Sequence, residues 1–157
     1  MQVEDPVALL RRESRSLVQR LRLWTPARFA AQAGAGTRAD LVHHLAQRLA
    51  DQAAEAEQRA RRPLPRLDDL ALPDQLAVTA DDLARVADAG TARAATAHLL
   101  LHRRDLLDED VPAGLAAALG DVLADGRADC ARSAQALPAP GTTKAGPRTD
   151  RPSYERD

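Results

Sequence analysis

The stretch 37-TRADLVHHLAQRL-49 carries the clearest fold signal in this sequence. Thr37 is a residue type that favours the position before a helix, and Asp40 follows at the spacing of a capping box. Apolar residues then recur at helical spacing on one face: Leu41, Val42, Leu45 and Leu49. The stretch therefore predicts an amphipathic helix that begins after Thr37 and ends within the charged residues 55–62.

The same kind of apolar stripe predicts further helices on both sides of this one. Asp5-Pro6 has the pattern of a helix start, an acidic N-cap followed by proline. Gly90 is expected to end one helix as a left-handed cap, and Thr91 to begin the next. The other expected helices cover about 5–23, 73–90 and 91–108, with a weaker segment from 111 onward. No strand-like alternation stands out.

These segments predict an all-α protein, an antiparallel four-helix bundle with an additional C-terminal helix. From Pro138 to Asp157 the chain is rich in proline, glycine and charge and has no apolar period, which is typical of a disordered tail. We therefore expect a single helical domain over residues 1–137 and a disordered tail over 138–157. A chain of 157 residues is long enough to build one core.

Composition narrows the classes of partner and compartment. Aromatic residues make up only 2%, so leucine, valine and alanine must fill the core. The formal net charge is −1, so we expect neither nucleic acid nor an anionic membrane as a partner. The single Cys130, the absence of a secretory signal after Met1 and the lack of a long apolar run favour a cytoplasmic protein. Alanine-rich surfaces make a homodimer plausible.

The four histidines fall on two of the expected helices. His98 and His102 are four residues apart, so they share one helix face. His44 lies on the border of the apolar stripe of its helix, while His43 is rotated roughly 100° further from that stripe. We expect His98 and His102 to point inward, and His44 to be the better candidate to join them.

Three imidazoles in a core of leucine and alanine would be costly without a shared partner, and a divalent metal could serve as one. Three histidine ligands with an open position are typical of a catalytic zinc site. The prediction is therefore a metal site formed by His44, His98 and His102, with zinc favoured and nickel or iron(II) as alternatives. Such a metal could activate a water or a thiol substrate at neutral pH.

Other interpretations of these residues stay open. A lone H-x-x-x-H pattern on a helix is a weak signal, and His43 could replace His44 as a ligand. Asp105 could accept a hydrogen bond from a ligand imidazole, or simply pair with an arginine at the surface. The chain could be a non-catalytic bundle that binds a small molecule or a protein, or an interaction subunit in which the histidines are incidental.

Two stretches resemble the family of DinB-like bundles that includes the N-terminal domain of mycothiol-dependent maleylpyruvate isomerase. Residues 37–46, TRADLVHHLA, are similar to the second helix of that family, in which a histidine before Leu-Ala is the first ligand. Residues 97–106, AHLLLHRRDL, are similar to its last core helix, in which two further ligands precede an Asp-Leu pair. The resemblance covers roughly residues 5–125, and it places the ligands at His44, His98 and His102.

The resemblance implies a metal-dependent transferase or isomerase that uses a low-molecular-weight thiol such as mycothiol. It leaves the small-molecule substrate undefined. The sequence departs from the family in its spacing, because only 53 residues separate His44 from His98. A smaller pocket is therefore expected.

Overall fold

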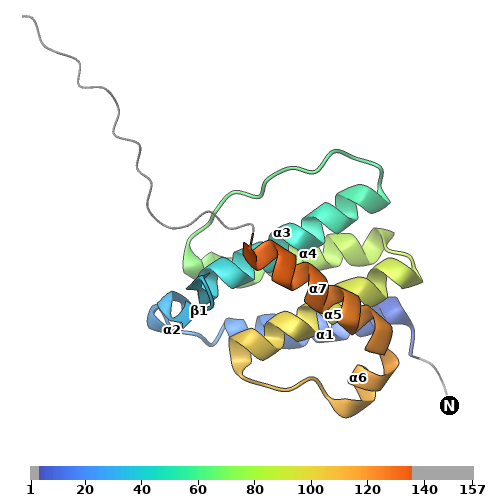
Figure 1. The fold of residues 1–157 in the computed structure, drawn as a ribbon. Helices are drawn as coiled ribbons and strands as arrows, with labels where there is room; N and C mark the ends of the chain where they lie inside the picture. The colour runs from blue at the N-terminus through green and yellow to red at the C-terminus, as the bar shows by residue number, and fades with distance from the viewer. Residues whose placement is uncertain (1–3, 136–157) are drawn as a thin grey trace, which may run out of the picture.

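The computed structural model describes residues 4–135, which are mostly α-helical, as the sequence predicts. Four long helices, with a fifth at the C-terminal end, account for most of these residues, and short elements connect them (Figure 1). In chain order the elements are α1 (Pro6–Leu21), α2 (Pro26–Ala30), β1 (Gln32–Ala33), β2 (Gly36–Thr37), α3 (Arg38–Ala56), the 3-10 turn η1 (Asp69–Ala71), α4 (Leu72–Val86), α5 (Ala89–Leu107), α6 (Ala113–Ala118) and α7 (Gly120–Gln135).

The helices α1, α3, α4 and α5 pack against one another around the main core. α3 packs on α4 and α5, and α1 packs on the same two helices. Leucines supply most of this core, together with alanines that let the helices approach closely. Trp24 and Phe29 close one end of it, with their ring centroids 5.1 Å apart in an edge-to-face arrangement. The two aromatic side chains thus complete a core that aliphatic residues dominate.

The helix starts at Asp5 and Thr37 lie where the sequence predicts them. The Asp5 carboxylate accepts hydrogen bonds from the backbone N–H groups of Val7 and Ala8. Thr37 and Asp40 form both halves of a capping box at the start of α3. α1 ends at Leu21, two residues earlier than expected, because the chain turns there to carry Trp24 into the core.

The boundary between α4 and α5 differs from the prediction. α4 ends at Val86, and Gly90 lies inside the first turn of α5 rather than acting as a left-handed cap. The carboxylate of Asp88 caps α5 by accepting a hydrogen bond of 2.7 Å from the Thr91 backbone N–H. The first N–H groups of a helix have no acceptor within the helix, and the Asp88 carboxylate provides one. α5 therefore begins earlier than it would with Thr91 as its cap.

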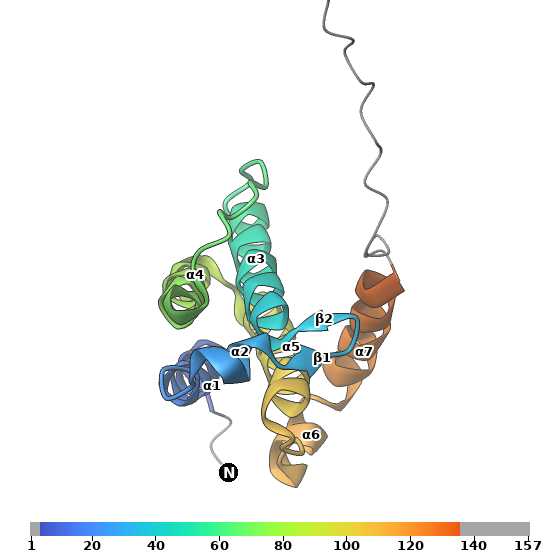
Figure 2. The ribbon, with the colours of Figure 1, turned by 90° about the vertical axis from the view of Figure 1, so that its left-hand side faces the viewer.

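The expected fifth segment is two helices, α6 and α7. Both pack against a second apolar cluster that is separate from the main core and is built on Ala97, Leu100 and Leu101 of α5 with Leu119 and Leu123. Figure 2 shows α7 on the side of α5 that faces away from α1 and α4. Because α5 serves two clusters, its residues Leu99, Leu100 and Leu101 are all buried.

A short antiparallel hairpin, which the sequence analysis did not predict, connects α2 to α3. Gln32 pairs with Thr37 and Ala33 with Gly36. Gly34 turns the chain with a φ of +65°, a left-handed conformation that favours glycine. The hairpin lies beside the N-terminal end of α3 (Figure 1), where it forms one wall of the candidate site.

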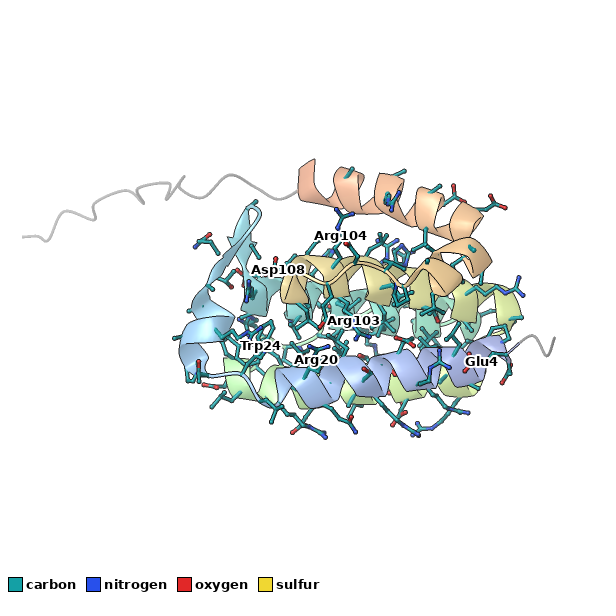
Figure 3. The ribbon with its side chains drawn as sticks, turned by 90° about the horizontal axis from the view of Figure 1, so that it is seen from below. Glu4, Arg20, Trp24, Arg103, Arg104 and Asp108 are labelled. Carbon is teal, nitrogen blue, oxygen red and sulfur yellow. The ribbon has the colours of Figure 1, made fainter. Side chains whose placement is uncertain are left out.

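A network of charged side chains joins α1 to the end of α5. Arg103 donates to Glu13 of α1 at 3.2 Å and also contacts Glu109 at 3.1 Å, and Arg20 of α1 contacts the other oxygen of Glu109 at 2.5 Å. Figure 3 shows Arg103 and Arg20 between the two helices. Glu13 is buried, so this pairing fixes the position of α5 against α1.

Part of the domain prediction falls on residues that the structure does not describe. The expected tail over 138–157, and the last residues of the expected domain, lie outside the described residues 4–135. Within that range, no helix combines the length and the apolar character that crossing a membrane requires.

Candidate ligand pocket

The structure brings two of the three predicted ligand histidines together. His44 on α3 and His102 on α5 have ring centroids 6.3 Å apart, with the ring planes inclined by only 28°. His102 is 5% exposed, whereas His44 is exposed at the mouth of the pocket that both residues line. The pairing follows from the packing of α3 on α5 and from the position of His102 near the C-terminal end of α5.

A hydrogen bond to the backbone orients His102. Its Nδ1 lies 2.9 Å from the carbonyl oxygen of His98, one turn earlier on the same helix. A carbonyl can only accept, so Nδ1 carries the proton and Nε2 is left with a lone pair. The far edge of the ring, which carries Nε2, therefore points away from the α5 backbone. Within residues 4–135, the bond from Nδ1 is the hydrogen bond recorded for the His102 ring.

His98 faces a different neighbourhood. Its Nδ1 accepts a hydrogen bond of 3.3 Å from Nε of Arg48 on α3. The opposite edge lies against α7, because a Cβ atom built on Gly126 would lie 3.4 Å from His98 Nε2. His98 is buried, as expected, but it does not line the pocket that holds His44 and His102.

The three imidazoles therefore do not converge in this arrangement. Among residues 4–135, no group of three or more histidine, cysteine, aspartate or glutamate side chains is placed to hold a metal ion. His98 is the ligand that fits least, because joining the other two would require its ring to leave Arg48. The metal site stays a prediction, and the pair His44 and His102 is the part of it that the geometry favours.

His43 packs in another direction. Its Nδ1 lies 3.2 Å from Oε1 of Gln75 on α4, and the residue is half-buried. His43 therefore faces α4 while His44 faces the pocket, because consecutive residues of an α-helix point roughly 100° apart. His43 is a natural control residue for tests of the site.

The cavity beside His44 and His102 has a volume of about 700 Å³, and we call it the hairpin pocket. Its walls are the β1–β2 hairpin, the first turns of α3, and the end of α5 with the loop that follows. The residues that line it are Ala33, Gly34, Ala35, Gly36, Thr37, Asp40, Leu41, His44, His102, Arg104, Asp105, Asp108 and Asp110. Helices distant in sequence thus meet the hairpin at one cavity.

The capping box of α3 is also a wall of the pocket. The carboxylate of Asp40 accepts from the backbone N–H of Thr37 at 2.9 Å and from its hydroxyl at 2.8 Å. A Cβ atom on Gly36 would lie 3.0 Å from the Asp40 carboxylate, so a side chain there would have to displace this carboxylate. The same residues that start the helix therefore shape the cavity.

Both pocket histidines are kept neutral near pH 7. Burial lowers the pKa of His102, and the nearby His44 and Arg48 lower it further, against an opposing contribution from the hydrogen bond to His98. The pKa of His44 is also lowered, first by desolvation and then by Arg48 and His43. Two neutral imidazoles can accept a hydrogen bond, take up a proton or ligate a metal.

Carboxylates dominate the charge of the pocket wall. Of the described residues, four aspartates line it against one arginine, Arg104, which lies 3.9 Å from Asp110. Asp40 lies 3.8 Å from Arg66 and Asp108 lies 3.5 Å from Arg38, both as single contacts. Asp105 has no ion pair within the described residues, and it is not the acceptor for His102 Nδ1. Figure 3 shows Arg104 and Asp108 near this end of α5.

The sequence analysis missed the hairpin and the carboxylates of this wall. Thr37 and Asp40 were recognised only as a helix cap, although the Ala33–Gly36 segment before them signalled a tight turn. Asp108 and Asp110 lie in the loop after α5, and nothing in their spacing indicates that the loop folds back over His102.

A second cavity of about 750 Å³ lies between α3, α4 and the extended connection that joins them. Alanines such as Ala50 and Ala53 and the exposed Val78 supply much of its lining. None of the described residues that line it is a histidine, so the hairpin pocket is the better candidate for a chemical site.

Comparisons with family models, with curated proteins and with solved structures find no match to this chain. The resemblance to DinB-like bundles therefore rests on the two sequence stretches alone.

Proposed function

We propose that this chain is a small-molecule-binding helical protein whose ligand occupies the hairpin pocket. The observation that carries the proposal is a pair of neutral imidazoles, His44 and His102, in the wall of a cavity of about 700 Å³. Ligand sites typically enclose about 300–1,000 Å³ and combine apolar walls with a few polar groups. The pocket has both, because Leu41 and Ala33 lie beside the histidines and aspartates.

The two histidines differ in what they offer a ligand. His102 presents an acceptor nitrogen from a buried and fixed ring, so it provides orientation. His44 is more exposed, so it can exchange a proton with a ligand or with solvent. A buried acceptor ring and an exposed imidazole in one cavity also give the site the parts for proton transfer.

A binding screen with matched variants tests this proposal. Fragments of differing charge are added to the full chain, and amide shifts are followed by two-dimensional NMR. Binding should shift amides of 33–44 and 102–110, and His102→Phe should abolish those shifts. His43→Ala is the control, because His43 faces Gln75 rather than the pocket. Fragments that bind elsewhere, or equally well to His102→Phe, would contradict the proposal.

A metal-dependent enzyme of the DinB-like class is the second candidate, and the orientation of His102 favours it. Metal-ligating histidines usually donate their other ring N–H to a carbonyl or carboxylate, as His102 does to His98. His44 and His102 would hold zinc or another divalent ion, and the metal would supply a Lewis acid for a bound water or low-molecular-weight thiol. This second proposal also assigns the fold: α1, α3, α4 and α5 would be the four helices of a DinB-like bundle.

Elemental analysis of untagged protein, purified without chelators, tests the second candidate. A site of three histidines predicts that His44→Ala, His98→Ala and His102→Ala each lose the metal. A site formed by the pair predicts loss in His44→Ala and His102→Ala only, with His43→Ala unaffected in both cases. The candidate fails if the unmodified chain carries no stoichiometric metal and gains none when zinc, nickel or iron(II) is added.

A further inference from the structure

We propose that the hairpin pocket selects organic cations, small molecules that carry a protonated amine on an apolar body. This inference rests on the proposed function of the pocket and names the chemistry of its ligand. Its basis is the juxtaposition of an imidazole acceptor, Nε2 of His102, with the aspartates of the pocket wall.

The wall of the pocket offers a hydrogen-bond acceptor on His102. His102 is 5% exposed, and its Nδ1–H is already used by the carbonyl of His98 at 2.9 Å. Its Nε2 therefore presents a lone pair on the far edge of the ring, and the described residues place no donor on it. His102 lines the pocket, so a ligand that brings an N–H group can pair with this lone pair, whereas one that brings another acceptor cannot.

The wall of the pocket offers negative charge beside that acceptor. Asp105 lies three residues after His102, close to one helical turn, and lines the cavity without an ion pair in residues 4–135. Asp108 and Asp110 lie on the loop that follows, and Arg104 of α5 is the one arginine among residues 4–135 that lines the cavity. A ligand carboxylate or phosphate would face these aspartates, whereas an ammonium group would be attracted to them.

Arg48, which contacts His98, does not cancel this preference. It lowers the pKa of both His44 and His102, so its charge is felt at the two rings, but it does not line the pocket. Its Nε donates to Nδ1 of His98 at 3.3 Å, and His98 does not line the pocket either. The charged side chains that a ligand in the cavity would contact are thus the aspartates and Arg104, and not Arg48.

The remaining walls fit an apolar body attached to the amine. Leu41 and the alanines Ala33 and Ala35 line the cavity, and its volume of about 700 Å³ exceeds that needed by a bare ammonium or metal ion. Burying an aliphatic or aromatic body of the ligand against these side chains would add affinity through the hydrophobic effect. The pocket is therefore matched to an amine with an aryl or alkyl group.

Three probes of matched shape test the charge preference: phenethylamine, phenethyl alcohol and hydrocinnamate. Their affinities for the full chain are measured by NMR titration in buffer that contains a chelator, so that metal does not contribute. The amine should bind roughly tenfold or more tightly than the alcohol, because a hydrogen bond from a charged donor exceeds one from a neutral donor. Hydrocinnamate should bind most weakly.

Variants separate this inference from the proposed function. Asp105→Asn should weaken the amine about two- to fivefold and leave the alcohol unchanged, since an exposed ion pair contributes modestly. Asp81→Asn, an exposed aspartate of α4 outside the pocket, is the matched control. Equal binding of all three probes, or tighter binding of hydrocinnamate, overturns the cation preference while the pocket stands. If no probe shifts amides of the pocket, both proposals fail.

Discussion

At the scale of single residues, the protonation of His102 controls what the pocket can accept. The groups that face its ring are His44, Asp105, Arg48 and the carbonyl of His98, and burial outweighs the two that favour the charged form. His102 should therefore stay neutral at pH 7, because its pKa lies below 6.5, the ordinary value for histidine. Protonation would replace the Nε2 lone pair with a second N–H donor and repel an ammonium ligand.

We expect both His102 and His44 to titrate below 6.5 when their ring carbons are followed by NMR. Because the unfolded chain binds protons more readily than the native one below this pH, the free energy of unfolding should fall as pH decreases through that range. His102→Gln should reduce this dependence, and amine binding should weaken over the same range. Titration of His102 above 6.5 would contradict the burial argument.

At the scale of elements, the capping box links the start of α3 to the pocket wall. The Thr37 hydroxyl accepts from the Asp40 backbone N–H at 3.1 Å, while the Asp40 carboxylate accepts from Thr37 in return. Removing one partner leaves an N–H group of the first helical turn without an acceptor. It also releases the carboxylate that the hairpin packs against at Gly36.

Thr37→Ala should lower the free energy of unfolding by about 1 kcal/mol, measured in urea at pH 7. The same change should raise the pKa of Asp40 only part of the way toward its ordinary value, because alanine keeps the backbone N–H that lowers it most and removes only the hydroxyl. The contribution of the Asp40 carboxylate to the free energy of unfolding is present above pH 3.8, and it is lost as the pH falls through the lowered pKa of this group. Thr37→Ser retains the acceptor and should behave like the unmodified chain.

Contact between α7 and α5 is close at one glycine. A Cβ atom on Gly126 would lie 3.1 Å from Leu101 Cδ1 and 3.4 Å from the His98 ring, whereas one on Gly114 of α6 would meet nothing within 4 Å. Gly114→Ala should therefore stabilise the chain by about 0.5–1 kcal/mol through helix propensity. Gly126→Val should destabilise it by roughly 1–3 kcal/mol, because the added volume separates the helices. Equal melting shifts in the two variants would show that α7 does not pack here.

At the scale of the whole molecule, the sequence predicted the parts that periodicity encodes. Stripes such as Leu41 to Leu49 fix a helix and its buried face, and the i, i+4 spacing of His98 and His102 places them on one helix. The two rings nevertheless point to different neighbours, because Arg48 and Gly126 engage His98 while a backbone carbonyl turns His102 to the pocket. The orientation of each ring depends on contacts with other parts of the fold, and a local sequence pattern does not contain this information.

The hairpin escaped prediction for a related reason. Strands of two residues are too short to show alternation, and only the pairing of Gln32 with Thr37 defines them. The boundary between α4 and α5 was also predicted wrongly, because the side chain of Asp88 caps α5 in place of Thr91. Local signals thus fix which segments are helical, while tertiary contacts decide where some of them begin and what wall they build.

The two apolar clusters predict that the molecule unfolds in stages. The main core joins α1 to α5, whereas α6 and α7 bury their apolar side chains in a smaller cluster against one face of α5. Opening that cluster would expose Leu100, Leu101 and the His98 ring but leave the main core intact. Segments that bury less apolar surface open at a lower free energy than the whole protein.

Amide hydrogen exchange should therefore show lower protection in α6 and α7 than in α3 and α5, with α3 exchanging only at the global free energy of unfolding. Leu123→Ala removes a buried side chain of the smaller cluster and should lower protection in α7 selectively. Leu45→Ala, in the main core, should lower it throughout the molecule. If α7 and α3 exchange at the same free energy in all three proteins, the two clusters unfold as one unit. In that case His98 would be held against Arg48 by the whole fold, and turning its ring toward the pocket would require global unfolding.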